Sequence, residues 1–223
     1  TLQGDAGDDT VNGGAGDDLI IWNVGDGRDK INGGGNGDIG DTLEINGTGL
    51  GETYRFYAIT DPTAAALAAA LGPFAATTEI VVTFNDGSGE NVIAELDNIE
   101  EIVINTDALE TSAPGLSDIG GDNIEVIGDF TTTSLNVQTI TINGSDGDDV
   151  IDISQLQSEH RIVFKSNGGN DKLVGTLRPQ DIIELPEGTG STTETDNGDG
   201  TRTVSYASGS VTFASSASST NVL

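Results

Sequence analysis

The chain alternates turn-forming segments rich in glycine, asparagine and aspartate with short segments that contain β-forming residues. The pattern is clearest at the N-terminus, where residues 4–12 read GDAGDDTVN and residues 13–21 read GGAGDDLII. The first six residues of each block favour a tight turn, because glycine, asparagine and aspartate tolerate positive φ. The last three, such as Thr10-Val11-Asn12, suit a very short strand with one side buried. Each block therefore predicts one turn and one strand.

Related blocks recur along the chain, with an aspartate in sixth place and an aliphatic residue in eighth. Residues 144–152, GSDGDDVID, repeat the N-terminal pattern closely. Less regular blocks occupy residues 24–32, 36–44, 117–125 and 166–174. The 36–44 block carries Ile39 where glycine is expected, and the 117–125 block lacks the leading glycines. Because one such unit cannot bury its apolar side alone, neighbouring units must stack.

We therefore expect an all-β dominated fold, a parallel β-roll with a small α/β insert that contains one short helix. In the roll, turn, strand, turn and strand make one coil of a flattened helix with two parallel sheets. Blocks that are two apart then stack on the same edge. Asp9 is expected beside Asp29 on one edge, and Asp18 beside Asp41 on the other.

The pattern divides the chain into four segments. Residues 1–46 form the N-terminal roll, and residues 47–95 break the period and read as the α/β insert, with strands at YRFYAI and EIVVTF. Residues 96–186 return to short β runs and read as a more degenerate continuation of the roll. Residues 187–223 read as a hairpin, RTVSYA and GSVTFA, with a serine-rich tail.

The helix of the insert is predicted near residues 62–71. Asp61 would cap its N-terminus, Pro62 would be its first residue and Gly72 would end it. Leu67 and Leu71, four residues apart, would share one face.

Charge adds a constraint that the periodicity does not give. The chain has 37 acidic and 8 basic residues and a net charge of −29. Nucleic acids and anionic membrane surfaces favour lysine and arginine, so neither is an expected partner. Such charge also opposes compaction unless counterions bind. There is no cysteine, which excludes disulfides, zinc–thiolate sites and thiol nucleophiles. No apolar run of 18 residues predicts a membrane span.

The chain begins inside the repeat pattern, at Thr1-Leu2-Gln3-Gly4, without a methionine. We therefore expect it to be part of a longer polypeptide with other domains, and any targeting signal to lie outside it.

Stacked turns of this kind bring carboxylates and backbone carbonyls together. Calcium takes six to eight oxygen ligands in flexible geometry, whereas magnesium demands a tight octahedron and keeps its water. Zinc prefers histidine and cysteine, and the chain has one histidine and no cysteine. Calcium is therefore the expected cofactor.

Residues 13–21 match the nonapeptide G-G-x-G-x-D-x-U-x, with Gly13, Gly14, Gly16, Asp18 and Ile20 in place. The chain thus resembles the RTX, or haemolysin-type calcium-binding, proteins, whose repeat forms a calcium-binding β-helix. The resemblance implies a parallel β-roll that folds on calcium outside the cell. It also implies a bacterial protein that is exported unfolded by type I secretion.

The same resemblance implies a set of ligands. The side-chain ligands would be the sixth-position aspartates Asp9, Asp18, Asp29, Asp41, Asp149 and Asp171. Carbonyl ligands would come from first- and third-position residues such as Gly4, Ala6, Gly13 and Ala15. The candidate metal-binding set also includes Asp8, Asp17, Asp26, Asp38, Asp122, Gly144, Asp146 and Asp148.

A second resemblance concerns residues 50–190. The segments LDNIEEIVINT and HRIVFKSNGGNDKLVGTLRPQDIIELP, with the alanine-rich helix, resemble the repeat-rich region of large secreted bacterial proteins that carry an animal-type haem peroxidase domain. It implies no haem chemistry for this chain. The only histidine, His160, has no neighbour in sequence that suits an axial ligand, and it is predicted to be a surface or turn residue.

The leading hypothesis is a non-enzymatic, calcium-folded module that acts as a folding aid for an attached domain or as a spacer in an adhesin. The alternative is a fragment of a secreted enzyme, a hydrolase or peroxidase, whose insert carries or supports chemistry. A concave pocket with a perturbed carboxylate in the insert would favour the enzyme, and a plain helix packed on a sheet would not.

Other interpretations of single motifs are weaker. Aspartate- and glycine-rich stretches are often disordered, but blocks in register argue against that here. Residues 196–201, DNGDGT, predict a turn, because an EF-hand loop would need a glutamate in twelfth place. Helix capping explains Asp61-Pro62 without calcium-triggered cleavage, and Asp17-Asp18 recurs as a repeat rather than as a glycosidase pair.

Overall fold

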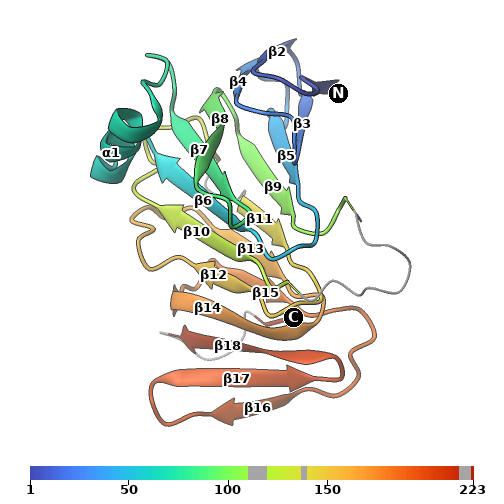
Figure 1. The fold of residues 1–223 in the computed structure, drawn as a ribbon. Helices are drawn as coiled ribbons and strands as arrows, with labels where there is room; N and C mark the ends of the chain where they lie inside the picture. Colours follow the sequence, from blue (N-terminus) through green and yellow to red (C-terminus); the bar gives the residue numbers. More distant parts are fainter. Residues whose placement is uncertain (110–119, 137–139, 216–221) are drawn as a thin grey trace.

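The structure is a computed structural model that describes residues 1–109, 120–136, 140–215 and 222–223. In these ranges the chain is dominated by β-strands and contains one α-helix, as the sequence pattern predicts. The strands form two sheets, one of seven and one of eleven strands, and within each sheet they follow one another along the length of the molecule (Figure 1). No helix of the described residues is both long enough and apolar enough to cross a membrane.

The seven-stranded sheet is parallel throughout. Its strands, in spatial order, are β1 (Leu2–Gln3), β3 (Leu19–Asn23), β5 (Thr42–Asn46), β9 (Glu101–Asn105), β11 (Ile140–Asn143), β13 (Ile162–Lys165) and β15 (Ile182–Glu184).

The eleven-stranded sheet is mixed. Parallel pairs make up most of it, but β6, β7 and β8 form one antiparallel group and β16, β17 and β18 form another. In spatial order its strands are β16 (Thr193–Asp196), β17 (Thr201–Tyr206), β18 (Gly209–Ser215), β14 (Gly169–Leu177), β12 (Val150–Asp152), β10 (Asn123–Ile127), β6 (Thr53–Ala58), β7 (Ile80–Asn85), β8 (Asn91–Asp97), β4 (Asp29–Gly35) and β2 (Thr10–Ala15).

Outside the two antiparallel groups, the chain crosses from one sheet to the other after each strand. We call the turns that lead into the eleven-stranded sheet the first edge, and those that lead into the seven-stranded sheet the second edge. On the first edge Thr10 pairs with Lys30, and on the second Leu19 pairs with Thr42. The expected stacking of Asp9 with Asp29, and of Asp18 with Asp41, is confirmed by this register.

The hydrophobic core lies between the two sheets. Ile20, Leu43 and Ile102 of the seven-stranded sheet and Val11 and Ile31 of the other belong to one cluster of buried side chains. Burial of one such side chain contributes about 1.5–3 kcal/mol. Alternate residues along each short strand are therefore enough to hold successive turns in register.

An asparagine ladder closes the seven-stranded sheet where the chain enters the first edge. The amide of Asn46 donates to Asn23 at 3.1 Å, that of Asn105 to Asn46 at 2.9 Å, and that of Asn143 to Asn105 at 2.5 Å. Each ladder residue is the last residue of its strand. The ladder therefore aligns the residues at which the strands end and the first-edge turns begin.

The insert is a helix packed on strands. Helix α1 (Pro62–Leu71) begins where the Asp61 carboxylate accepts the N–H of Thr63 at 2.8 Å, and it ends at Gly72, whose φ is 102°. These are the predicted cap and stop. Leu67 and Leu71 pack against a small second core that includes Tyr57, Val81 and Val92. The helix lies outside the two-sheet stack (Figure 1).

The C-terminal segment contains the predicted hairpin, formed by β17 and β18, and β16 adds a third antiparallel strand. Residues 196–201 include an exposed turn in which Asp199 accepts the N–H of Thr201. Val222 forms a parallel bridge to Ile183 of β15. Most of the predicted serine-rich tail, residues 216–221, and the start of the 117–125 block lie outside the described residues.

The prediction that His160 is a surface or turn residue is wrong. Its side chain is buried, with Nδ1 2.9 Å from Ser158 Oγ and Nε2 2.9 Å from the carbonyl of Leu135. Its ring also meets Phe130 edge-on, with 5.9 Å between the ring centroids. The partner at Leu135 lies 25 residues away, so the neighbouring sequence does not reveal this burial.

Candidate metal centre

The sixth-position aspartates form ladders along both edges. On the first edge, Asp9 N donates to Asp29 Oδ1 at 3.0 Å, and Asp149 N donates to Asp171 Oδ1 at 3.0 Å. On the second edge, Asp18 N donates to Asp41 Oδ1 at 2.7 Å. Each carboxylate therefore accepts the backbone N–H of the equivalent residue in the neighbouring turn. These side chains lie immediately before a strand or near its start, which aligns them along the edge.

Two glutamates and Asp122 belong to the same ladders. Glu52 N donates to Asp122 Oδ1, and Asp122 N donates to Asp149 Oδ1, each at 2.8 Å. Asp41 N donates to Glu100 Oε2 at 2.7 Å. The nonapeptide template misses Glu52 because residues 47–55, GTGLGETYR, carry glutamate in sixth place and tyrosine in eighth, and it misses Glu100 because no glycine precedes it in ELDNIE. The signal that would have found them is an acidic residue directly before a β run.

Burial separates the sixth-position carboxylates from their neighbours. Asp29, Asp41, Asp122, Asp149 and Asp171 are buried, and Asp9 and Asp18, in the outermost turns, are half-buried. The fifth-position residues Asp8, Asp17 and Asp148 are exposed.

Fifth-position carboxylates bond to the backbone of the stacked turn. Asp8 Oδ1 accepts the N–H of Arg28 at 3.2 Å, and Asp148 Oδ1 accepts that of Asn170 at 2.7 Å. Asp17 accepts four N–H groups, from residues 37–40. These bonds, that of Gly40 above all, lower the pKa of Asp17. Fifth-position carboxylates are therefore already supplied with donors.

The remaining candidates occupy different surroundings. Asp26 is buried and accepts the N–H of Asn23 within its own turn at 2.8 Å. Asp38 and Asp146 are exposed, as are Ala6 and Ala15. The structure therefore brings the sixth-position aspartates together at each edge and leaves Asp38 and Asp146 at the surface.

Among the described residues, Asp41 Oδ2 and Asp122 Oδ2 are buried carboxylate oxygens without a hydrogen-bond partner. The Thr106 hydroxyl still favours the charged form of Asp122, although it does not reach good hydrogen-bond geometry with Oδ2. A buried polar atom without a partner costs about 1–3 kcal/mol, and more when it is charged. Asp149 and Asp171 differ, because Ser145 and Ser166 donate to their second oxygens.

Glycines keep space beside these oxygens. A Cβ at Gly13 would lie 3.0 Å from Asp18 Oδ2, and a Cβ at Gly4 would lie 3.0 Å from Asp29 Oδ2. A Cβ at Gly33 would collide with Asp41 Oδ2 and the Asn98 carbonyl, and one at Gly144 with Asp149 Oδ2. The turns also approach each other closely, since a Cβ at Gly13 would collide with the carbonyl of Gly33. Carbonyl and carboxylate oxygens thus gather where side chains are excluded.

Burial disfavours the charged form of the first-edge carboxylates when no cation is bound. It raises the pKa of Asp122 and of Asp149 to about 7 and that of Asp171 to about 6. Neighbouring carboxylates add to each shift, for example Asp149 on Asp122. Burial also raises the pKa of Asp29, with contributions from Asp9, Asp26 and Asp8.

Carboxylates of the insert are compensated differently. Glu95, which is buried, accepts from Arg28 Nη2 at 2.9 Å, and Glu90 accepts from Arg55 Nη1 at 3.1 Å. Although burial opposes ionisation of both, their hydrogen bonds, including those from the arginines, lower both pKa values. Carboxylates held ionised in this way are poorly suited to proton transfer.

The described residues contain no group of three or more histidine, cysteine, aspartate or glutamate side chains arranged to hold a metal ion. Any cation at these edges would therefore rely on backbone carbonyls as well as on paired carboxylates. The chain matches no protein-family model, and the search of the curated proteins found no match.

Proposed function

We propose that this chain is a calcium-binding module of a secreted bacterial protein, and that its two sheets form a parallel β-roll of the RTX type. Calcium would act as a structural and folding switch. Support comes from the stacked register of the glycine-rich turns, the ladders of buried carboxylates and the net charge of −29.

The observation that carries the proposal is the second oxygen of Asp41. It is buried, it has no hydrogen-bond partner among the described residues, and a glycine holds open the space beside it. A charged oxygen that is buried without a hydrogen-bond partner is costly, and a bound cation would offset that cost. Asp18 of the neighbouring turn lies on the same edge, with its own Oδ2 beside Gly13.

The donor set fits calcium best. Asp18 and Asp41 would supply carboxylate oxygens, and Gly13 and its neighbours in the turn would supply carbonyls. Calcium accepts such mixed oxygen ligands in flexible geometry. When bound, the ion supplies the positive charge that the N-terminal turns of this edge lack beside Asp41.

Coupled binding and folding follows from the same charges. Without calcium, repulsion between stacked carboxylates opposes closure of the turns. With calcium, binding free energy becomes folding free energy, because the unfolded chain has no preformed site. Export of the chain unfolded by type I secretion, followed by folding in external calcium, fits this mechanism.

The role is proposed as non-catalytic, either as a folding aid for an attached domain or as an adhesin spacer. Helix α1 packs as a plain helix on strands, and the buried carboxylate Glu95 is held by Arg28. Asp86 lines a concave pocket beside the insert, but hydrogen bonds from Ser88 lower its pKa, so this carboxylate is held ionised and is poorly suited to proton transfer. These observations favour the module over the enzyme fragment.

The first experiment is far-UV circular dichroism of the chain in chelator, followed by a calcium titration to about 10 mM with a magnesium control. We expect a calcium-specific increase in β signal, because oxygen coordination fixes the turns. A fully folded spectrum in chelator that does not respond to calcium would refute the proposal.

Two isosteric variants then test the assignment of ligands. Asp41→Asn keeps the acceptor for Asp18 N but removes the charge at the candidate site, so calcium stoichiometry measured by titration calorimetry should fall by about one ion. Asp17→Asn is the matched control, because its carboxylate is supplied with backbone donors and lies at the adjacent position of the repeat. Equal stoichiometry in wild type and Asp41→Asn would contradict the assignment.

A further inference from the structure

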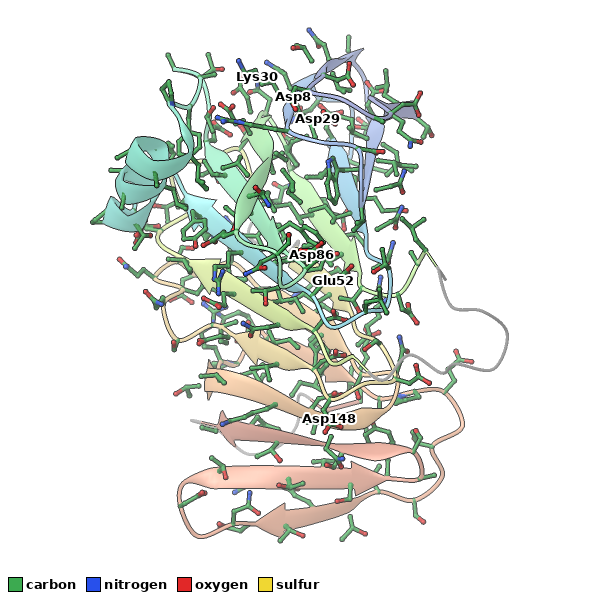
Figure 2. All side chains as sticks on the ribbon, in the orientation of Figure 1. Asp8, Asp29, Lys30, Glu52, Asp86 and Asp148 are labelled. Atoms are coloured by element: carbon green, nitrogen blue, oxygen red, sulfur yellow. The ribbon has the colours of Figure 1, made fainter. Side chains whose placement is uncertain are left out.

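A cavity of about 520 Å³ lies between the insert and the N-terminal turns, and none of the features used above accounts for it. It forms because β4 pairs with β8 only from Asp29 and Ala94 onward. On the side away from β7, residues 91–93 of β8 therefore border the turn at residues 24–28 rather than a strand. Figure 2 shows Asp8 near the start of β2 and Asp86 near the lower end of β7. Both residues line the cavity.

The floor of the cavity is apolar. Trp22, Phe84 and Val92 line it, and the rings of Trp22 and Phe84 meet at a tilt with 6.1 Å between their centroids. All three side chains are largely buried, so they offer a fixed wall rather than a mobile patch. An apolar stem that covers this wall would gain roughly 25 cal/mol per Å² of buried surface.

The charge that lines the cavity is negative. Asp8 and Asp86 make no ion pair in the described part of the chain. The Ser88 hydroxyl and N–H hold the pKa of Asp86 below its usual value. Lys30 lines a separate, smaller hollow with Asp8.

Arg28 also lines the cavity, but its guanidinium is already engaged. It pairs with Glu95 through two N–H groups, donates to the carbonyls of Leu71 and Pro73, and stacks over Phe74 with 5.6 Å to the ring centroid. Its charge is compensated by the buried Glu95. The cavity therefore offers a ligand its apolar floor, the exposed Asp86 and, well apart from it, Asp8, which also accepts the N–H of Arg28 (Figure 2).

We propose that this cavity binds an ammonium or guanidinium group carried on an apolar stem, either a free organic amine or a basic side chain of a partner polypeptide. The carboxylates attract the cation, the floor takes the stem, and the net charge of −29 concentrates cations around the molecule. Calcium alone lacks the stem and uses none of the apolar surface.

Trp22 is the only tryptophan in the chain, so its fluorescence reports on this cavity alone. The probes are n-hexylammonium, n-hexanol and n-hexanoate, added to the whole chain in saturating calcium. We expect a saturable fluorescence change with hexylammonium, at least fivefold weaker binding of hexanol, and none of hexanoate. Equal affinities for hexylammonium and hexanol, or no saturable change with any probe, would overturn the proposal.

Asp86→Asn should weaken hexylammonium binding about fivefold. Asp199→Asn is its matched control, because both aspartates are exposed and accept the N–H of the residue two positions on at 2.9 Å. Both variants change the net charge by the same amount, so only an effect confined to Asp86→Asn supports the site. Equal weakening in the two variants would show non-specific attraction and would refute it.

A capped tripeptide with a central lysine separates the two sources of the cation. Binding at least fivefold tighter than that of hexylammonium would assign the cavity to a partner polypeptide, and weaker or equal binding would assign it to free amines. The proposal is independent of the calcium proposal, whose failure would appear in circular dichroism and not in these titrations.

Discussion

Two buried carboxylates on the second edge, Asp41 and Asp181, show how differently the same position can be compensated. Each lies directly before a strand of the seven-stranded sheet, and each accepts a backbone N–H from the neighbouring coil, Asp41 from Asp18 and Asp181 from Ile162, the first residue of β13. Arg178 donates to both oxygens of Asp181 through Nε and Nη2. Asp41 has no arginine, and its Oδ2 has no partner among the described residues.

The contrast locates the carboxylates for which the chain supplies its own cation and those for which it does not. Arg178 also binds the carbonyls of Ser158 and His160, so the C-terminal turn of the second edge contains its own cation. Glu95 of the insert is compensated in the same way, by Arg28 of the N-terminal roll. Arg28 is the one arginine of residues 1–46 and is engaged by Glu95, which is why a cation from solvent is proposed for the N-terminal carboxylates.

The largest effect is expected for Arg178→Met, which makes Asp181 an uncompensated buried charge like Asp41. Loss of one partner of a buried ion pair costs about 3–5 kcal/mol. The free energy of unfolding, from urea denaturation in saturating calcium, measures it. Arg202→Met is the control, because Arg202 and Glu194 are both substantially exposed and their pair contributes less than about 1 kcal/mol.

A double variant sharpens this test. Arg178→Met with Asp181→Asn removes both charges and should recover part of the stability, since the remaining amide is cheaper to bury than a carboxylate. If the double variant is no more stable than Arg178→Met, packing of Arg178 rather than its charge is the cause.

The second expected effect is on pH dependence in chelator. Asp122 and Asp149 have pKa values of about 7 because of burial, whereas an unfolded aspartate has a value near 4. The folded chain therefore binds more protons between these values, and its stability falls as pH rises from about 4 to about 7. We expect stability to be lost progressively over this range and to level off above it.

Thermal unfolding followed at pH 5 and pH 8 measures this loss. In calcium the trend should reverse, because protons compete with the cation for the same carboxylates. Higher stability at pH 8 than at pH 5 in chelator would show that these carboxylates are compensated by something other than protons.

Gly33→Ala tests the space reserved beside Asp41. Its Cβ would collide with Asp41 Oδ2 and the Asn98 carbonyl, and overpacking of this kind costs about 1–3 kcal/mol. Gly35→Ala is the matched control, because the nearest atom to its Cβ is the Gly14 carbonyl at 3.8 Å. Denaturant melts of the two variants should differ accordingly, and equal stability would mean that the turn yields easily.

The smallest effect is expected for Arg55→Met. Arg55 pairs with Glu90 at 3.1 Å and with Glu125 at 2.9 Å, but all three side chains are partly exposed to water. Solvent screening limits the loss to about 1 kcal/mol, measurable by the same urea denaturation. A loss as large as that of Arg178→Met would show that burial does not determine how much these ion pairs contribute to stability.

Much of the fold follows from the sequence because its signals are local. Alternating apolar positions give the short strands, and Asp61 and Gly72 give the helix bounds. The block spacing gives the register, since Asp9 and Asp29 are separated by 20 residues and Asp18 and Asp41 by 23. These features depend on residues that are close together or repeated.

What the sequence left out depends on contacts between distant residues. Burial of His160 depends on Leu135, and Arg178 reaches the carbonyls of Ser158 and His160 across a neighbouring turn. The asparagine ladder was also missed, although an asparagine ends each of the runs IIWN, LEIN, IVIN and ITIN. The hydrogen bonds between these asparagines become evident only when the strands lie side by side. The distinction between fifth- and sixth-position carboxylates likewise requires the stacked backbone.

The strands of the insert belong to the eleven-stranded sheet alone, so the insert interrupts the carboxylate series of one edge and not that of the other. Because β5 and β9 remain neighbours, the carboxylate series Asp18, Asp41 and Glu100 passes the insert without interruption. On the first edge, β7 and β8 lie between β4, which begins at Asp29, and β6, which directly follows Glu52. Occupancy of the second edge should therefore be cooperative along the molecule, whereas the N-terminal part of the first edge should fill and empty as an independent unit.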